Sequence, residues 1–268
     1  MIKQIICINW GSKYGAPYIN RLYGMISRNI TPPFSVICFT DDATGVRKEV
    51  ACIPLPELNC ELPLNTKGIW SKARLWDQDL NGVEGVVLFL DLDVVIVGSL
   101  DGFFEFGDPD DVILARNWIR PLEKLGQTSV YRFPVGKLHP LKDLFLENPQ
   151  GIADKYKYEQ RFVTRMAPGG IKFWPSNWVS HFRLDCIKTW PTNYFRVPAP
   201  RKDCKIVIFP GNLNPPDAIL GCWSSKDQAN PPLTHLKLAF SKDRRESFTR
   251  HIRHFILPTP WVEDLWKE

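Results

Sequence analysis

Residues 86–97 read Val-Val-Leu-Phe-Leu-Asp-Leu-Asp-Val-Val-Ile-Val, an apolar run interrupted only by Asp91 and Asp93. The run is rich in β-branched residues and has a glycine on each side, which predicts one buried strand rather than a helix. An ionised carboxylate removed from water requires a counter-charge, a metal ion or several hydrogen-bond donors. Residues two apart in a strand share a face, so we expect Asp91 and Asp93 to project together and Leu92 to point into the core. The pattern predicts a site at which both carboxylates hold one cation.

Composition indicates a folded protein with reduced thiols. The chain has 268 residues, of which 44% are hydrophobic, enough for a buried core. It has no apolar stretch long enough to span a membrane, and its first residues turn polar too soon for a signal peptide. Seven cysteines occur without C-x-x-C spacing, which favours free thiols over a disulfide framework. We therefore expect a soluble cytoplasmic protein.

Positive charge is concentrated near the C-terminus. The net charge is +5, and residues 235–254 alone carry an excess of four positive charges. Apolar residues interleave with these charges, which indicates an amphipathic helix or a pair of helices. A solvated face over a small core is the favoured interpretation, and a peripheral contact with the anionic inner face of a membrane is the alternative. The rest of the chain is close to neutral and has no recognition motif, which argues against nucleic acid as a partner.

Alternating strand and helix signals up to residue 97 predict an α/β fold with a mostly parallel sheet. Asp41 and Asp42 follow the second strand and favour a turn or cap over a ligand role. We expect Asp101 to cap a short helix at 102–106. The other expected helices begin after Pro17, cover 69–80 and return near 141 and 162, and the expected strands are 3–9, 34–40, 50–55, 86–97, 112–115, 128–133 and 205–209.

Six features of the sequence occur in a characteristic order and spacing. They are a first strand that leads into a glycine-containing loop, Trp-Ser-Lys-Ala-Arg-Leu at 70–75, Leu-Phe-Leu-Asp-Leu-Asp at 88–93, Thr-Ser-Val at 128–130, Tyr-Glu-Gln at 158–160 and Phe-Pro-Gly at 209–211. In this arrangement the chain resembles nucleotide-sugar-dependent glycosyltransferases of the GT-A fold, with 88–93 as the DxD motif and the first loop as the nucleotide-binding loop. Within that group it is most similar to the glycogenin and lipopolysaccharide galactosyltransferase family, which is glycosyltransferase family eight-like. The resemblance covers about residues 3–216.

The resemblance implies a Rossmann-related, mixed and mostly parallel central sheet flanked by helices. Residues 1–216 would form the glycosyltransferase domain, with a nucleotide-binding half at about 1–115 and a sugar and acceptor half at about 116–216. Residues 217–268 would form a basic amphipathic C-terminal helical appendage. The implied activity is transfer of a sugar from a UDP-sugar to a glycan or lipid-linked acceptor, with retention of configuration, in polysaccharide, lipopolysaccharide or glycoconjugate synthesis.

The resemblance also implies residue roles. Asp91 and Asp93 would hold Mn²⁺ or Mg²⁺ against the diphosphate, where the ion acts as a Lewis acid. Glu159 and Gln160 would lie beside the anomeric carbon, and Asn117 would contact the sugar, so these three are the catalytic candidates. The donor-binding candidates are Asn9, Trp10, Gly11, Tyr14, Thr40, Asp41, Lys72, Asp91, Leu92, Asp93, Gly211 and Asn212.

The sequence departs from the family pattern at two positions. The third metal ligand of the family is a His just before the Gly of the last motif, and Pro210 stands there instead. The metal would then rely on two carboxylates with phosphates and water, or on another residue such as His235, and weak or absent metal dependence stays open. Glu159 stands where the family usually has Asp, which moves the carboxylate outward by one methylene.

Two other functions are compatible with parts of the pattern. One is a non-catalytic, transferase-like protein that binds a sugar nucleotide or a glycan, which the Pro210 substitution favours. The other is a haloacid-dehalogenase-like phosphatase, which also places Asp-x-Asp after an apolar strand. Such phosphatases need a Thr two positions after the second Asp, and here that position is Val95.

Overall fold

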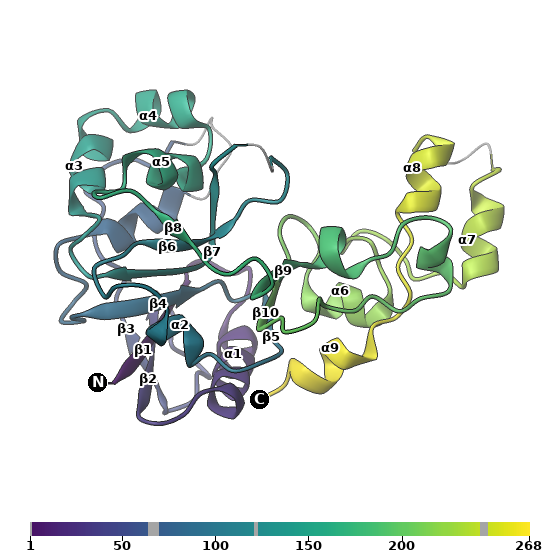
Figure 1. Cartoon of the computed structure of the whole chain (residues 1–268), viewed down its shortest axis with the longest axis horizontal. Coiled ribbons are helices and arrows are strands. Elements are labelled where there is room, and N and C mark those ends of the chain that lie inside the picture. Colours follow the sequence, from purple (N-terminus) through teal and green to yellow (C-terminus); the bar gives the residue numbers. More distant parts are fainter. Residues whose placement is uncertain (1, 64–69, 121–122, 242–245) are drawn as a thin grey trace.

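The computed structural model describes residues 2–63, 70–120, 123–241 and 246–268, which form two β-sheets with helices around them (Figure 1). The larger sheet has seven strands in the order β3-β2-β1-β4-β7-β6-β8, and the smaller has the order β5-β10-β9. Strands β3, β2, β1 and β4 run parallel, whereas β7 is antiparallel to both of its neighbours. The central sheet is therefore mixed and mostly parallel, which confirms the predicted fold class.

Most of the predicted elements are present within a few residues of their expected bounds. The strands are β1 (Lys3–Asn9), β2 (Phe34–Thr40), β3 (Val50–Ile53), β4 (Val86–Leu90), β5 (Val94–Ile96), β6 (Ile113–Arg116), β7 (Gly126–Pro134), β8 (Lys172–Phe173), β9 (Val179–His181) and β10 (Ile206–Ile208). The helices are α1 (Ala16–Asn29), α2 (Gly102–Glu105), α3 (His139–Glu147), α4 (Pro149–Tyr156), α5 (Glu159–Met166), α6 (Pro215–Leu220), α7 (Pro232–Leu238), α8 (Phe248–Arg253) and α9 (Pro260–Leu265). Helical turns of other types are η1 (Trp70–Trp76) and η3 (Thr192–Tyr194), which are 3₁₀, and η2 (Phe182–Cys186), which is a π-helical turn.

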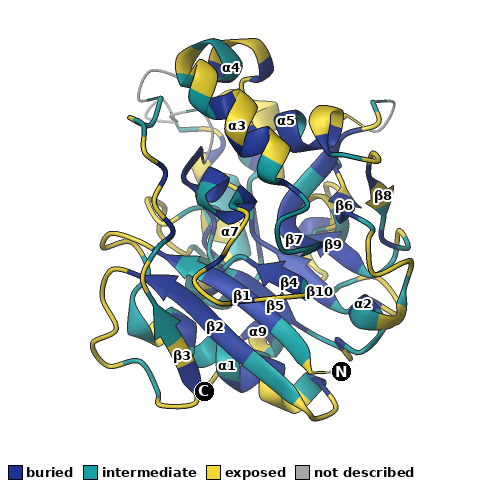
Figure 2. Ribbon diagram, turned by 90° about the vertical axis from the view of Figure 1, so that its left-hand side faces the viewer, coloured by how far each residue is buried: buried dark blue, intermediate teal, exposed yellow. Residues whose placement is uncertain are grey.

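Two hydrophobic cores lie on opposite faces of the larger sheet. Alternate residues of a strand point to opposite faces, so Ile5 and Leu88 enter one core while Ile6 and Val87 enter the other. The first core joins the sheet to α1 and to the smaller sheet, and the second joins it to η1, α3 and α5. Figure 2 shows the buried strands between these layers. The strands are apolar on both sides because both of their faces are covered.

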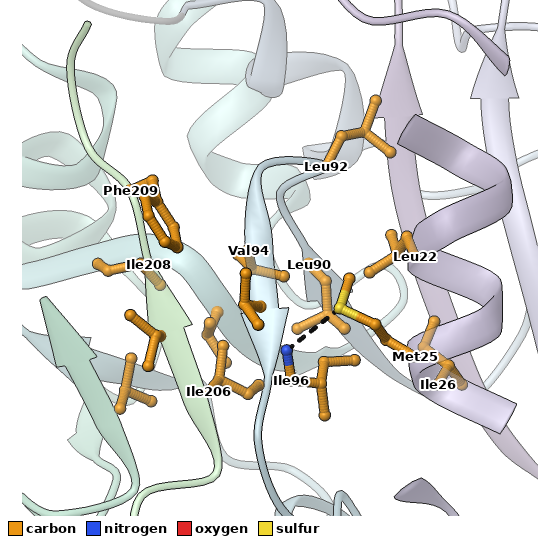
Figure 3. Close-up of a cluster of buried hydrophobic side chains, with 14 of the residues drawn as sticks. Leu22, Met25, Ile26, Leu90, Leu92, Val94, Ile96, Ile206, Ile208 and Phe209 are labelled. Atoms are coloured by element: carbon orange, nitrogen blue, oxygen red, sulfur yellow. Dashed lines mark hydrogen bonds between the residues drawn. The ribbon is translucent and has the colours of Figure 1, made fainter. Parts of the chain in front are cut away.

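The prediction of one strand over residues 86–97 is wrong, because the run divides into β4 and β5, which belong to different sheets. The ladder of the larger sheet ends with the Asp91 N–H, which donates to the Ser129 carbonyl at 3.0 Å. The chain then turns at 91–93 and enters β5, which pairs antiparallel with β10. Strands β4 and β5 are both largely buried, so their hydrophobicity alone does not reveal that the chain passes from one sheet to the other. Leu92 is 2% exposed and packs in the first core, as predicted (Figure 3).

Two local predictions also differ from the structure. The helix expected over 69–80 is a 3₁₀ turn, η1, and Ile69 lies outside the described residues. Asp101 precedes α2, but its side chain does not cap that helix. Its carboxylate instead accepts hydrogen bonds from Lys3 Nζ at 2.6 Å and from the Thr31 N–H at 3.0 Å. Asp101 therefore ties the start of β1 to the segment that precedes β2.

The C-terminal residues return to α1 after α6, α7 and α8 extend to one side of the sheets (Figure 1). Val262 and Trp266 enter the first core. Arg28 of α1 donates to the backbone carbonyls of Leu265, Lys267 and Glu268. In the described ranges, no helix has the length and apolar character needed to cross a bilayer. Part of the predicted basic segment, Lys242, Asp243, Arg244 and Arg245, lies outside the described residues, and the domain boundary at 216 stays a prediction.

Gly24 marks the contact between α1 and the C-terminal residues. A Cβ at this position would lie 2.5 Å from the Glu268 carbonyl carbon and 2.6 Å from the Lys267 carbonyl oxygen. We expect Gly24→Ala to lower the free energy of unfolding by about 1–3 kcal/mol, because the C-terminal residues must move away. In a chain ending at Trp266 the same substitution should stabilise by up to about 1 kcal/mol, because alanine favours a helix over glycine. Urea unfolding of the four chains measures this, and equal effects of Gly24→Ala in both backgrounds would contradict it.

Candidate active site

A pocket of about 790 Å³ lies where several strands end. Its walls come from the residues that follow β1, β4 and β10, together with the start of β7, the start of α5 and part of η1. Ligands of open α/β sheets bind beyond the carboxyl ends of the parallel strands, and β1 and β4 meet that description here. The predicted site residues that line this pocket are Trp10, Gly11, Tyr14, Lys72, Asp91, Leu92, Asp93, Glu159, Gln160 and Gly211.

The loop after β1 is held by three predicted residues that do not themselves line the pocket. Asn9 Oδ1 accepts from the Gly15 N–H at 3.1 Å, and Asn9 Nδ2 donates to Thr40 Oγ1 at 3.2 Å. Asp41 Oδ2 accepts from the Gly11 N–H at 3.1 Å. These bonds fix the loop that presents Trp10, whose side chain remains about half exposed. The aromatic face of Trp10 is therefore accessible at the mouth of the pocket.

Asp42 has the turn role that the sequence predicts. Its Oδ1 accepts from the Thr44 N–H at 2.8 Å, which is a local turn contact, and this bond lowers the pKa of the carboxyl. Asp42 does not line the pocket. Of the two neighbouring acids, only Asp41 is connected to the loop beside the site.

Asp91 forms an ion pair with a buried lysine in the pocket wall. Lys72 Nζ lies 2.7 Å from Asp91 Oδ1, and the Lys72 side chain is only 7% exposed. The same ammonium donates to the Thr128 carbonyl at 3.1 Å and lies 4.8 Å from the centre of the Phe89 ring. A buried charge must have such partners, because its loss of hydration is otherwise uncompensated. Lys72 of η1 thus supplies part of the positive charge that the two aspartates require.

Asp93 is bound on the other side by Tyr14. The Tyr14 hydroxyl donates to Asp93 Oδ2 at 2.7 Å, and Lys13 Nζ contacts the same hydroxyl. Desolvation in the pocket wall, followed by the negative charge of Asp91, raises the pKa of Asp93 to about 6, and the bond from Tyr14 partly opposes this. Desolvation and the charge of Asp93 also raise the pKa of Tyr14, so that its hydroxyl keeps its proton. The negative charge of Asp91 thus disfavours ionisation of Asp93.

Glu159 is buried at the first turn of α5, with its carboxyl group against the pocket. Its Oε2 accepts from Thr128 Oγ1 at 3.0 Å, and its Oε1 has no partner among the described residues. Burial raises the pKa of Glu159 to about 7, while the charge of Lys72 opposes the shift. The neighbouring Gln160 also lines the pocket. This acid–amide pair presents a carboxyl that changes protonation near neutral pH.

Two further predicted residues, Asn117 and Asn212, lie outside the pocket lining, and some residues that do line it were not predicted. Asn117 is buried, and its Oδ1 accepts from the Ile119 N–H at 2.9 Å in a local turn. Asn212 follows the lining residue Gly211 but does not line the pocket itself. Gln127 and Ser129 do line it, and they bond to each other through Gln127 Nε2 and Ser129 Oγ at 2.7 Å. Ser129 stands in the 128–130 motif, whereas Gln127 has no sequence signal, because its place depends on the pairing of β7 with β6, where Gln127 lies opposite Ala115.

No family model matches the sequence, and no curated protein matches it. The galactosyltransferase LgtC, solved with donor and acceptor sugar analogues, aligns with a TM-score of 0.57 at 14% identity over 98% of this chain and 100% of its own. The glycosyltransferase GlyE of Streptococcus pneumoniae aligns with a TM-score of 0.56 at 12% identity over 100% of this chain and 65% of its own. Mouse xyloside xylosyltransferase 1 gives 0.51 at 14% identity, over 77% of this chain and 97% of its own. This chain has the GT-A fold.

GT-A enzymes often use a divalent metal ion, and Asp91 and Asp93 are the pocket residues that the sequence predicts to bind one. Asp91 and Asp93 each have one oxygen bound by a protein group, and Pro210 lines the pocket with no ligand atom. Across the described ranges, no three His, Cys, Asp or Glu side chains form a group that could hold a metal ion. His235 lines a different pocket of about 520 Å³, and its Nδ1 bonds to the Tyr194 hydroxyl at 2.7 Å. The described residues therefore do not form a complete divalent-cation site.

The raised pKa of Glu159 predicts a pH-dependent contribution to stability. Folding raises this pKa from 4.5 to about 7, so the stability due to the bound proton is present below pH 4.5 and is lost as the pH rises through 7. The loss is of the order of 3 kcal/mol. We expect Glu159→Gln, which cannot ionise, to gain stability relative to the wild type between pH 5 and pH 8.5.

Urea unfolding at both pH values measures this difference. The exposed Glu84→Gln is the control and should show the same pH dependence as the wild type. If Glu159→Gln and the wild type lose stability in parallel, Glu159 is not the titrating group that we describe.

Proposed function

We propose that this protein is a glycosyltransferase that moves a sugar from a UDP-sugar to a glycan or lipid-linked acceptor. The observation that supports this most is the content of the 790 Å³ pocket, which gathers Asp91, Asp93, Lys72 and the Glu159–Gln160 pair at the strand ends of a GT-A fold. The structural neighbours are glycosyltransferases, and LgtC was solved with donor and acceptor sugar analogues. The pocket of this chain, at about 790 Å³, has the size of a small-molecule site.

The walls of the pocket suit the parts of a nucleotide sugar. Trp10 and Tyr14 offer aromatic surface for the uracil ring, and Gly11 allows close approach of the backbone. Lys72 and Lys13 supply positive charge for the diphosphate. We assign the sugar to the end of the pocket that contains Glu159 and Gln160. Asn9, Thr40 and Asp41 act through the loop that they hold.

Sugar transfer breaks the bond between the anomeric carbon and a diphosphate oxygen, so negative charge develops on the leaving group. Positive groups fixed next to that oxygen stabilise the transition state, because they need no reorganisation during the reaction. Glu159 lies on the same wall and has one buried carboxyl oxygen without a described protein partner, and we assign to this carboxyl a contact with a sugar hydroxyl once the side chain turns toward the pocket. The roles of Asn117 and Asn212, the retention of configuration and the binding of Mn²⁺ or Mg²⁺ by Asp91 and Asp93 stay predictions.

The acceptor and the cellular setting also stay predictions. We assign the acceptor to the half formed by about residues 116–216. The contact of residues 235–254 with an anionic membrane has no support in the described residues beyond the exposed apolar side chains of α7 and its surroundings, such as Leu233 and Phe240.

A non-catalytic protein that binds a sugar nucleotide is the second candidate, and Pro210 is the observation that favours it. The phosphatase alternative gains nothing from the structure. Val95, at the position where such enzymes need a Thr, is fully buried in the first core and does not line the pocket.

Asp93→Asn tests catalysis. We expect sugar transfer to fall by at least about 100-fold, because the uncharged amide no longer attracts the cationic groups that stabilise the leaving diphosphate. The fold should persist, because the amide has the same shape and can still accept from Tyr14. UDP release from a panel of UDP-sugars, with and without glycan acceptors, gives the rate.

Asp143→Asn, an exposed change on α3, is the matched control and should leave the rate unchanged. Tight UDP binding without any release of UDP from the wild type would favour the non-catalytic candidate. Phosphate release from small phosphate esters, with no affinity for UDP, would favour a phosphatase.

A further inference from the structure

We propose that Lys72, assisted by Lys13 and Arg183, supplies the positive charge for the diphosphate, so that nucleotide binding and sugar transfer do not require a divalent metal ion. This inference rests on the proposed function, since it concerns the diphosphate of the same donor. It differs from the metal-assisted reaction that the DxD motif predicts. Three features of the described residues support it.

The first feature is that protein groups already bind both carboxylates, a lysine at Asp91 and a tyrosine at Asp93. Lys72 Nζ lies 2.7 Å from Asp91 Oδ1, so this oxygen already has a cationic partner. Tyr14 donates to Asp93 Oδ2 at 2.7 Å. The side chain of Pro210, which lines the pocket, offers no ligand atom. A metal ion would have to displace or avoid these protein contacts and would still depend on two protein ligands.

The second feature is that Lys72 is held in place before any ligand binds. Its side chain is buried, and its ammonium bonds to Asp91 Oδ1 and to the Thr128 carbonyl at 3.1 Å. An ammonium has three donors, and the described contacts account for two of them. Because Lys72 lines the pocket, the third donor is available to a phosphate oxygen. A fixed donor of this kind stabilises developing charge without the entropy loss of ordering a mobile side chain.

The third feature is that two more cations lie around the same pocket. Lys13, on the loop after β1, contacts the Tyr14 hydroxyl, so that Asp93 is linked to a lysine as Asp91 is. Arg183 lies beside the turn that carries Pro210, and its Nη1 is 3.7 Å from the position of a Cβ on Gly211. Arg183 Nη2 donates to the Trp223 carbonyl at 2.7 Å, which anchors the guanidinium. Two lysines of the pocket lining are thus connected to the two acids, and a third cation, Arg183, lies beside the turn that carries Pro210 and Gly211.

The reaction balances without an added ion. The bond between the anomeric carbon and the diphosphate oxygen breaks, and its electron pair stays on that oxygen. The acceptor hydroxyl oxygen forms the new bond to the anomeric carbon, and its proton is released to water. Lys72 remains protonated throughout and acts as a hydrogen-bond donor to the diphosphate.

Calorimetric titration with UDP tests the proposal. EDTA-treated protein should bind UDP, and excess Mn²⁺ or Mg²⁺ should change the dissociation constant by less than about threefold. The rate of UDP-sugar turnover should likewise be the same in EDTA as in Mn²⁺. UDP binding or turnover that appears only with a divalent ion would overturn the inference but leave the proposed function standing. Absence of UDP binding under every condition would remove the proposed function itself.

Variants of Lys72 give a second readout. Lys72→Gln should weaken UDP binding in EDTA by about tenfold or more, and Lys72→Arg should retain most of the affinity. Mn²⁺ should now improve UDP binding to Lys72→Gln, because Asp91 has lost its cation. An unchanged affinity of Lys72→Gln in EDTA would refute the role of this lysine.

Lys142→Gln is the matched control. Lys142 is another buried lysine that pairs with an acid, Asp77, but it does not line the pocket. Its removal should reduce stability as removal of Lys72 does, without a change in UDP affinity. If Lys72→Gln does not fold, the exposed Lys13→Gln takes its place, and it should weaken UDP binding severalfold in EDTA. Equal affinities of Lys13→Gln and the wild type would then count against the proposal.

Discussion

The ion pair between Lys72 and Asp91 is the contact on which the geometry of the site depends. Asp91 ends the β4 ladder at the junction of the two sheets, while Lys72 belongs to η1 in the second core. The pair thus connects the turn between the two sheets to η1. This turn of helix packs in the second core, on the face of the larger sheet that points away from the smaller sheet. A buried ion pair gains little net stability from its attraction once desolvation is counted, but removing one partner is strongly destabilising. The pair therefore restricts how these elements can be arranged rather than adding much to their total stability.

The turn at 91–93 is rigid because hydrophobic packing surrounds it. Leu92 is buried between the two acids, and Leu90 and Val94 on either side are fully buried (Figure 3). The two carboxylates are held next to each other although they repel, and the strands on both sides oppose any separation. Desolvation in this apolar frame and the charge of Asp91 raise the pKa of Asp93, while the contacts of Lys72 with Asp91 and of Tyr14 with Asp93 compensate part of the negative charge.

The sequence predicted the central part of the site better than it predicted the path of the chain. Asp91 and Asp93 stood out because charges are rare in an apolar run, and both line the pocket. The same apolar run concealed the change of sheet, since β4 and β5 are equally buried and hydrophobicity does not report strand partners. The fold class followed from alternating strands and helices, which depend on local periodicity. The insertion of antiparallel β7 beside β4 depends on contacts between distant segments, and that is why Gln127 was not foreseen.

Three other residues lie near the pocket, as predicted, but their role there differs from the predicted one. Asn9, Thr40 and Asp41 lie next to the pocket and hold its loop instead of forming its surface. The resemblance to a family predicts that such residues lie near the pocket. Their hydrogen-bond partners depend on side-chain geometry, which the sequence does not reveal.

The walls of the pocket belong to two different sheets. The turn with Pro210 and Gly211 follows β10 of the smaller sheet, whereas Asp91, Thr128 and Ser129 belong to the larger sheet. The side chains packed between the sheets, such as Leu90, Val94 and Ile208, therefore act as spacers that set the width of the opening. A change in the volume of these buried side chains changes the width of the pocket and therefore the ligands that fit it. The residues that contact the ligand can stay the same. Such a fold can acquire new selectivity during evolution through its interior while its polar groups stay the same.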